Sequence, residues 1–227
     1  MTTCEEHSQN GKQNGYIHDG AINPERWYSS KVRLLFLLKE TYGYQGYDCI
    51  QITEYAPKWF EAKNKTYRKC VLLAAVLEKS LEKNHGLSAG DIKLVENDHD
   101  SLLAALNRIA VVNIKKDSGE SRSNDGKIRV VSKANASQLK AQICTLAPTV
   151  IVAGGNVCWD SLIDDMGLFH GVSKLEKFEA VKCGNTVLCR SNHPSAWRGG
   201  GFPIDVIHRA IFVAITKPSP DTQARRA

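Results

Sequence analysis

Long apolar segments are missing from this sequence, and with them the usual signs of a membrane or secreted protein. No stretch approaches the roughly 18 apolar residues of a membrane-spanning helix, and the polar segment 1–20 has no basic start followed by an apolar run. We therefore expect a cytoplasmic protein without a membrane partner. The patterns G-x-G-x-x-G and G-x-x-x-x-G-K-S/T are also absent, which argues against dinucleotide and nucleoside triphosphate binding.

Paired cysteine motifs are missing as well, because none of the seven cysteines forms a C-x-x-C pair. An odd number of scattered cysteines fits neither a disulfide framework nor a zinc or iron-sulfur site. We predict buried thiols, with no metal and no cofactor, at Cys4, Cys49, Cys70, Cys144, Cys158, Cys183 and Cys189.

The composition is that of an ordinary globular protein, with 42% hydrophobic and 24% charged residues in a chain of 227. This length predicts one domain, which we place at 25–217. Segment 1–24 is rich in Asn, Gln, Gly and His and has few large apolar side chains to bury, so we expect a mobile or surface-lying arm. Segment 218–227 is a basic tail. Thirty Lys and Arg against 24 Asp and Glu give a net charge of +6, which favours a polyanionic partner.

Short apolar runs alternate with helical patterns along the chain, which indicates an α/β fold. Strands are predicted in the runs 31–38, 109–114, 149–153 and 186–189, and helices over 64–85, 102–106, 138–147, from 156 and from 203. The polar segment 117–126 is predicted to be a surface loop. We expect a single-domain three-layer α/β/α sandwich around a mostly parallel four-stranded sheet.

Polar residues follow each predicted strand, and the carboxyl ends of parallel strands meet in one crevice. Glu40 follows the first strand, Asn113 and Lys115 end the second, the glycines 154–155 follow the third, and residues 192–193 follow the fourth. Each has an ordinary alternative: a solvated charge, a structural Asn, a pair of glycines for close packing and a turn His. Their convergence from four segments predicts a functional site.

Four ordered motifs carry a resemblance that covers roughly residues 31–216. They read KETYG after the first strand, VVNIKK at the second, QLKAQICTLAPTVIVAGG around the third and SNHPSAW after the fourth. This order resembles the uracil-DNA glycosylase superfamily, in particular the branch with a GEAPG first motif and an HPSA last motif. The resemblance implies a uracil-DNA glycosylase-like fold and a flipped base held in a pocket.

The resemblance also implies roles for individual residues in base removal. Glu40 matches the acidic residue that positions or activates water, although Asp48 remains an alternative. Asn113 matches the Asn that binds the pyrimidine edge, and His193 matches the motif histidine that stabilises negative charge on the departing base. The aromatic residue that stacks on the flipped base is Tyr47 or Tyr44.

DNA contacts are expected from the last motif and from lysines near the strand ends. Trp197 is the candidate wedge that enters the duplex, and Arg198 contacts a phosphate or the base stack. The other expected DNA-binding residues are Lys39, Lys115, Lys116 and Ser195.

The sequence departs from this branch in two ways. KETYG replaces GEAPG, so a small Gly gives way to Lys39 beside the proposed carboxylate, and the branch's iron-sulfur cysteines are absent. We expect a monomeric, monofunctional glycosylase that removes a deaminated or modified pyrimidine from DNA, including a hypermodified cytosine of phage DNA. The alternatives are a non-cutting reader of modified bases with the same fold and a nucleoside hydrolase-like enzyme.

Overall fold

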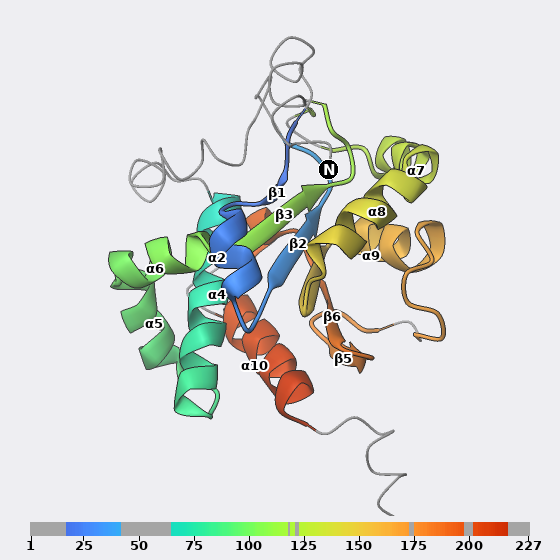
Figure 1. The fold of residues 1–227 in the computed structure, drawn as a ribbon. Coiled ribbons are helices and arrows are strands. Elements are labelled where there is room, and N and C mark those ends of the chain that lie inside the picture. The colour runs from blue at the N-terminus through green and yellow to red at the C-terminus, as the bar shows by residue number, and fades with distance from the viewer. Residues whose placement is uncertain are drawn as a thin grey trace, which may run out of the picture.

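The computed structural model describes residues 17–41, 65–117, 119–120, 123–172, 175–197 and 202–217. They form an α/β fold around one mixed sheet with the strand order β1-β3-β2-β4-β6-β5 (Figure 1). The α/β prediction is confirmed. The prediction of four strands is incomplete, because a short antiparallel strand lies at each edge of the four parallel ones.

The parallel part of the sheet consists of β2 (Leu34–Leu38), β3 (Ile109–Asn113), β4 (Val150–Gly154) and β6 (Thr186–Ser191). Strand β2 lies in the middle and pairs with both β3 and β4. All residues of β2, β3 and β4 are buried, as expected for strands with helices on both faces. The edge strands are β1 (Gly20–Ala21) and β5 (Ala180–Cys183).

Helices cover both faces of the sheet (Figure 1). Side chains alternate along β2, so Phe36 packs in the core with α4 (Lys65–Lys83), α5 (Ala89–Asn97), α6 (His99–Leu106) and α10 (Phe202–Thr216). Leu35 and Leu37 point to the other core, with α2 (Pro24–Ser29), α7 (Asp125–Ala134), α8 (Ala136–Leu146) and α9 (Asn156–Asp160). The three predicted layers are therefore present.

The segment before α2 is part of the sheet. Ile17 and Ile22 are buried in the core, and Gly20–Ala21 pairs with β3. The prediction of a mobile or surface-lying arm is therefore wrong for residues 17–22, because two buried isoleucines and one strand pairing offset the ordering cost of a short polar segment. Residues 1–16 and the basic tail 218–227 lie outside the described residues.

Helix α7 was not predicted, because its sequence begins inside a polar stretch that reads as a loop. The Asn124 side chain accepts a hydrogen bond from the Lys127 amide and caps this helix. Arg129 of α7 forms ion pairs with Asp160 at the end of α9 and with Asp164 and Asp165 in the π-helical turn (Ser161–Asp165) that follows α9. The Asp165 side chain is buried and lies 3.0 Å from Arg129. These ion pairs hold α7 against α9 and the π-helical turn.

The cysteine prediction is confirmed in part. Cys70, Cys158 and Cys189 are buried thiols, and burial raises the pKa of each of them. Cys144, in contrast, is exposed on α8. The raised pKa values disfavour the thiolate, so these three buried cysteines do not supply a nucleophile.

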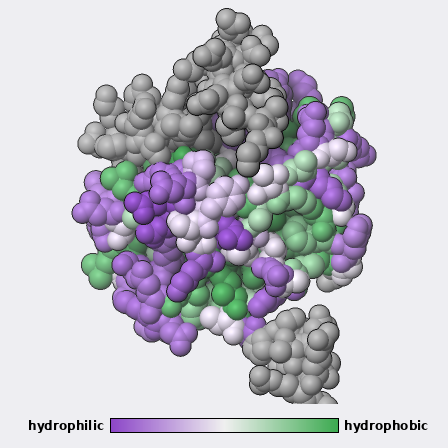
Figure 2. Space-filling view, in the orientation of Figure 1, coloured by the Kyte–Doolittle hydropathy of each residue, from purple (hydrophilic) through white to green (hydrophobic). Residues whose placement is uncertain are grey.

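No helix among the described residues is both long and apolar enough to cross a membrane. Hydrophilic and hydrophobic areas are interspersed on the face of the molecule drawn in Figure 2. The exposed large apolar side chains of the described residues each lie on a different helix: Tyr28, Leu94, Val130 and Val213.

Candidate functional site

The carboxyl ends of the four parallel strands bring the predicted polar residues to one edge of the sheet. Leu38, just before Lys39 and Glu40, is in register with Asn113 of β3, and Gly154 of β4 is in register with Ser191 of β6. Backbone hydrogen bonds extend the pairing beyond the strands, from Lys115 N to Lys39 O and from Gly155 N to Ser191 O. The predicted convergence of these segments is confirmed.

Glu40 lies just after the end of β2, between Lys115 and Gly119. Its side chain is 6% exposed, and its Oε2 lies 3.5 Å from Lys115 Nζ. Lys115 also contacts Asp117, at 3.2 Å. Gly119 lies so close that a Cβ on it would be 2.2 Å from the Glu40 Cδ, so only glycine leaves room for the carboxylate at this position.

Lys39, which was predicted to bind DNA, forms an ion pair inside the site. Its Nζ lies 2.5 Å from Asp125 Oδ1 at the start of α7. Its chain passes over Gly155, where an added Cβ would be 3.3 Å from Lys39 Cε. Gly155 also has a φ of +124°, which favours glycine. This turn therefore serves close packing, and α9 is too short to offer an anion site at its N-terminus.

His193 is held by the first residues of the loop after β6. Its Nδ1 accepts a hydrogen bond from the Ser195 amide at 3.3 Å and lies 2.8 Å from Ser195 Oγ. Burial, followed by the charges of Lys39 and Lys69, lowers the pKa of His193 from 6.5 to about 4. The imidazole is therefore neutral at pH 7, and because Nδ1 accepts, the proton resides on Nε2. The His193 side chain thus carries a neutral N–H donor at Nε2.

Trp197, the predicted wedge, belongs to the core. The residue is 3% exposed, and its Nε1 donates to Asn192 O at 2.9 Å. Its carbonyl oxygen accepts a hydrogen bond from Lys69 Nζ of α4. A wedge needs an exposed apolar side chain, so we correct this assignment: Trp197 anchors the loop that carries His193 and the exposed Ser195.

Asn113 is fully buried and is oriented by Asp19, a residue of the N-terminal segment. Asp19 Oδ2 accepts from the Asn113 backbone amide at 2.6 Å and from its Nδ2 at 3.1 Å. Because a carboxylate oxygen accepts hydrogen bonds, the amide nitrogen must face Asp19. The Asn113 Oδ1 then points elsewhere, and it has no hydrogen-bond partner among the described residues.

Lys116, another predicted DNA contact, is turned into this same network. Its Nζ lies 2.5 Å from Asp19 Oδ1 and 2.9 Å from Gln142 Oε1 of α8. Gln142 Nε2 also donates to the Asp19 carboxylate and backbone oxygens, both at 2.9 Å. The ammonium of Lys116 therefore faces protein groups, and we correct its assignment as a phosphate contact.

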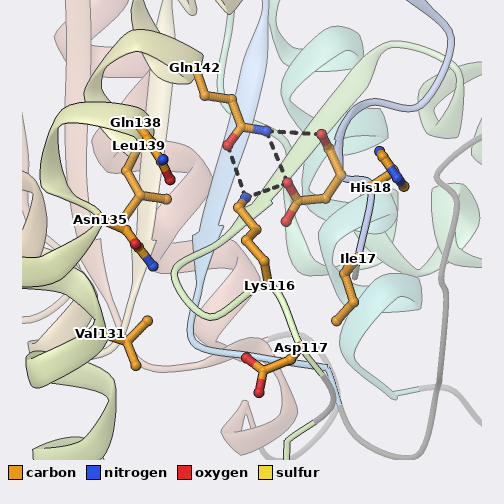
Figure 3. Close-up of a pocket in the computed structure, with 10 residues that line it drawn as sticks. Ile17, His18, Lys116, Asp117, Val131, Asn135, Gln138, Leu139 and Gln142 are labelled. Carbon is orange, nitrogen blue, oxygen red and sulfur yellow. Dashed lines mark hydrogen bonds and ion pairs between the residues drawn. The ribbon is translucent and has the colours of Figure 1, made fainter. Parts of the chain in front are cut away.

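The network forms one wall of a pocket of about 670 Å³ between the N-terminal segment and helices α7 and α8 (Figure 3). The residues that line it are Ile17, His18, Asp19, Lys116, Asp117, Val131, Asn135, Gln138, Leu139 and Gln142. Asp19, Lys116 and Gln142 form hydrogen bonds with one another, and a dashed line in Figure 3 marks the bond between the labelled Lys116 and Gln142. The polar groups of this wall therefore bind each other.

Several expected residues lie outside the described residues, namely Tyr44, Tyr47, Asp48 and Arg198. The described residues contain no group of three or more His, Cys, Asp or Glu side chains that could hold a metal ion. Sequence reasoning missed Asp19, Lys69 and Asp125. Gln142 was part of a quoted motif, although no role was assigned to it.

Comparisons with known proteins do not identify a family. No protein-family model matches the chain, and the searches of curated proteins and of solved structures find no match to it either. Its function must therefore be argued from the residues at the carboxyl edge of the sheet.

Proposed function

We propose that the chain is a monofunctional DNA glycosylase with a uracil-DNA glycosylase-like fold, which flips a non-standard pyrimidine out of DNA and hydrolyses its N-glycosidic bond. One observation carries the proposal. A carboxylate, a neutral imidazole and a buried carboxamide whose oxygen has no hydrogen-bond partner among the described residues lie at or just after the ends of three parallel strands of the mixed sheet, at Glu40, His193 and Asn113.

Cleavage of an N-glycosidic bond develops positive charge on the sugar and negative charge on the base, so a catalyst needs groups for both. Glu40 faces the sugar and orients the water whose oxygen bonds to C1′ as the bond from C1′ to the base nitrogen breaks. The electron pair of the broken bond leaves with the base, and the water proton passes to the carboxylate.

His193 acts on the other side of the breaking bond. Its Nε2–H donates to the base oxygen on which negative charge develops. A neutral donor suits this role, because it binds the base before and after cleavage without a proton transfer. The low pKa of His193 supports this assignment.

The pyrimidine that is removed is a deaminated or modified base, including a hypermodified cytosine of phage DNA. Lys39 and Asp125 form a polar pair at the site, where the resembling branch has a small glycine. Such a pair can donate to and accept from polar substituents on a base. Lys39 and Lys115 also lie at the edge where a DNA backbone must approach.

A second candidate is a non-cutting reader of modified bases, and the surroundings of Glu40 favour it. The carboxylate is 6% exposed, is held by Lys115 and is covered by Gly119. A reader needs the base pocket but no attacking water. This candidate predicts selective DNA binding without base release.

The two candidates separate in an assay of free-base release by mass spectrometry. The substrates are duplexes with uracil, deaminated purines, or hydroxymethylated or glucosylated cytosine. We expect release of one base class, and at least about a tenfold loss in Glu40→Gln and in His193→Ala, with duplex binding changed only a few-fold. Exposed Glu120 and His85 supply matched controls, Glu120→Gln and His85→Ala.

Each outcome assigns a function. Release that persists in Glu40→Gln and His193→Ala contradicts the mechanism. Tight, base-selective binding without release supports the reader. Activity on free nucleosides, with DNA binding that does not weaken as salt rises, assigns a nucleoside hydrolase-like enzyme instead.

A further inference from the structure

Within the described residues, the Asp19 network leaves one polar atom without a partner. Both oxygens of the Asp19 carboxylate accept two hydrogen bonds each, from Lys116, Gln142 and the two nitrogens of Asn113. Gln142 Oε1 is taken by Lys116. A network that satisfies itself has little left to bind a ligand in the adjoining pocket. The remaining acceptor is Asn113 Oδ1, which is buried and has no partner among the described residues.

A buried acceptor without a partner is costly in a folded protein unless something else supplies the donor. In an isolated Asn side chain the two amide orientations are close in energy, so either the oxygen or the nitrogen could face a base. Asp19 removes this freedom, because the reverse orientation would place the Asn113 oxygen against a carboxylate oxygen. Lys116 and Gln142 in turn fix Asp19.

We infer that Asp19 is a positioning residue that fixes the Asn113 carboxamide with its oxygen toward the flipped base, so that the site accepts bases carrying an N–H group on that edge. This inference rests on the proposed function. It assigns the selection of the base to a segment far from the strand-end motifs, because Asp19 lies 94 positions before Asn113.

The ligand class follows from the chemistry of the read edge. Uracil offers N3–H, and cytosine with its 5-substituted derivatives offers the 4-amino group. Methylation that removes these hydrogens, as in 3-methyluracil and N4,N4-dimethylcytosine, leaves the Asn113 oxygen unpaired and adds a clash. Asp19→Asn lets both amides turn, so the variant should bind N–H and N-methyl bases more equally.

The test measures binding by fluorescence anisotropy with the full chain. The probes are duplexes with one uracil or cytosine nucleotide at a mismatch and their N-methylated counterparts, all as 2′-fluoro nucleotides, which resist cleavage because fluorine disfavours positive charge on the sugar. For at least one of the two pairs, the unaltered protein should prefer the N–H base by about tenfold or more. Asp19→Asn should reduce this preference below about threefold.

Two further variants keep the test decisive. Asp117→Asn changes a carboxylate that lines the same pocket but pairs with Lys115, outside the hydrogen bonds of Asp19 and Asn113, and it should keep the full preference. Asp19→Asn leaves the Lys116 charge without its partner. The double variant Asp19→Asn/Lys116→Gln removes both charges and should show the same loss of preference if the single variant folds poorly.

A nuclear magnetic resonance measurement tests the positioning independently of activity. The side-chain NH₂ signals of Asn113, assigned with Asn113→Asp, should shift strongly in Asp19→Asn and not in Asp117→Asn. Unchanged signals, or an N–H preference that survives in Asp19→Asn and in the double variant, would overturn the inference even if the protein releases a base. Absence of base release with a lost preference in Asp19→Asn would instead reject only the catalytic part of the proposed function.

Discussion

Lys69 on helix α4 provides a direct test of the electrostatics at His193. Its ammonium donates to the Trp197 carbonyl, and its charge contributes, after burial and Lys39, to a His193 pKa of about 4. Lys69→Met keeps most of the aliphatic chain and removes the charge. We expect the pKa of His193 to rise in this variant.

The size of the rise is limited by the order of the causes. Removing one partly screened charge should raise the pKa by about half a unit to one unit. Burial is the largest cause and stays in place, so the pKa should remain below 6.5 even in the double variant Lys39→Met/Lys69→Met. At pH 7 the imidazole stays neutral in all of these proteins.

The lowered pKa also has a sign in stability. The folded protein resists protonation of His193 between pH 6.5 and about 4, whereas the unfolded chain takes up the proton. The contribution of this group to the free energy of unfolding is therefore present above pH 6.5 and is lost as the pH falls through this window. A shift of this size corresponds to at most about 3 kcal/mol.

The assay is a titration of the histidine ring signals by nuclear magnetic resonance, with His193→Gln to assign the signal. His208 serves as an internal control, because burial, followed by the charge of Arg209, lowers its pKa, while the Ile204 carbonyl and Asp205 of the same helix partly oppose this shift. A His193 pKa near 6.5 in the unaltered protein would refute the burial of His193 beside Lys39 and Lys69. A pKa that ignores Lys69→Met would refute the electrostatic contact.

Three more predictions test the packing around the site. Trp197→Ala should lower the free energy of unfolding by about 3–5 kcal/mol in urea titrations, because it leaves a cavity in the core and releases the loop that carries His193. A loss below about 1 kcal/mol would contradict the burial of the Trp197 ring. Gly119→Ala should reduce base release about as much as Glu40→Gln does, since its Cβ would displace the Glu40 carboxylate. Its melting temperature should change less than that of Trp197→Ala. Full activity of Gly119→Ala would contradict the close contact between Gly119 and Glu40. Arg129→Met should destabilise the fold by about 2 kcal/mol, because it leaves the buried Asp165 without its cation; Arg129→Met/Asp165→Asn should recover part of that loss in the same titration.

The sequence predicted the strands that continuous apolar runs mark. Strands β2, β3, β4 and β6 were all found within a few residues of their observed bounds, because strands buried on both faces need apolar side chains at every position. Strands β1 and β5 were missed. Strand β1 has only the two residues Gly20–Ala21, which are too few to show an apolar or alternating pattern. Strand β5 (Ala180–Cys183) is only half buried at an edge of the sheet, so its residues are not selected for hydrophobicity.

The site was predictable to the extent that it depends on strand ends. Glu40, Asn113 and His193 were predicted to lie at one edge of the sheet because polar residues stand at or just after the ends of apolar runs. Asp19 and Lys69 act through contacts with residues 94 and 128 positions away. Neither lies in a motif, and only the folded arrangement shows that one orients Asn113 and the other holds the His193 loop. The burial of Trp197 was also missed, because it depends on contacts with residues far away in the sequence.

The central position of β2 has a consequence for synthesis of the chain. This strand leaves the ribosome first among the four parallel strands, yet it pairs with β3 and β4, which follow much later in the sequence. Both edges of its apolar residues Leu34–Leu38 are therefore unpaired until β3 emerges, and one edge stays unpaired while the ribosome continues to Val150, on the order of ten seconds at ordinary translation rates. Because both pairings close long loops, sheet formation is slow, and the nascent chain is most prone to aggregation before β4 emerges.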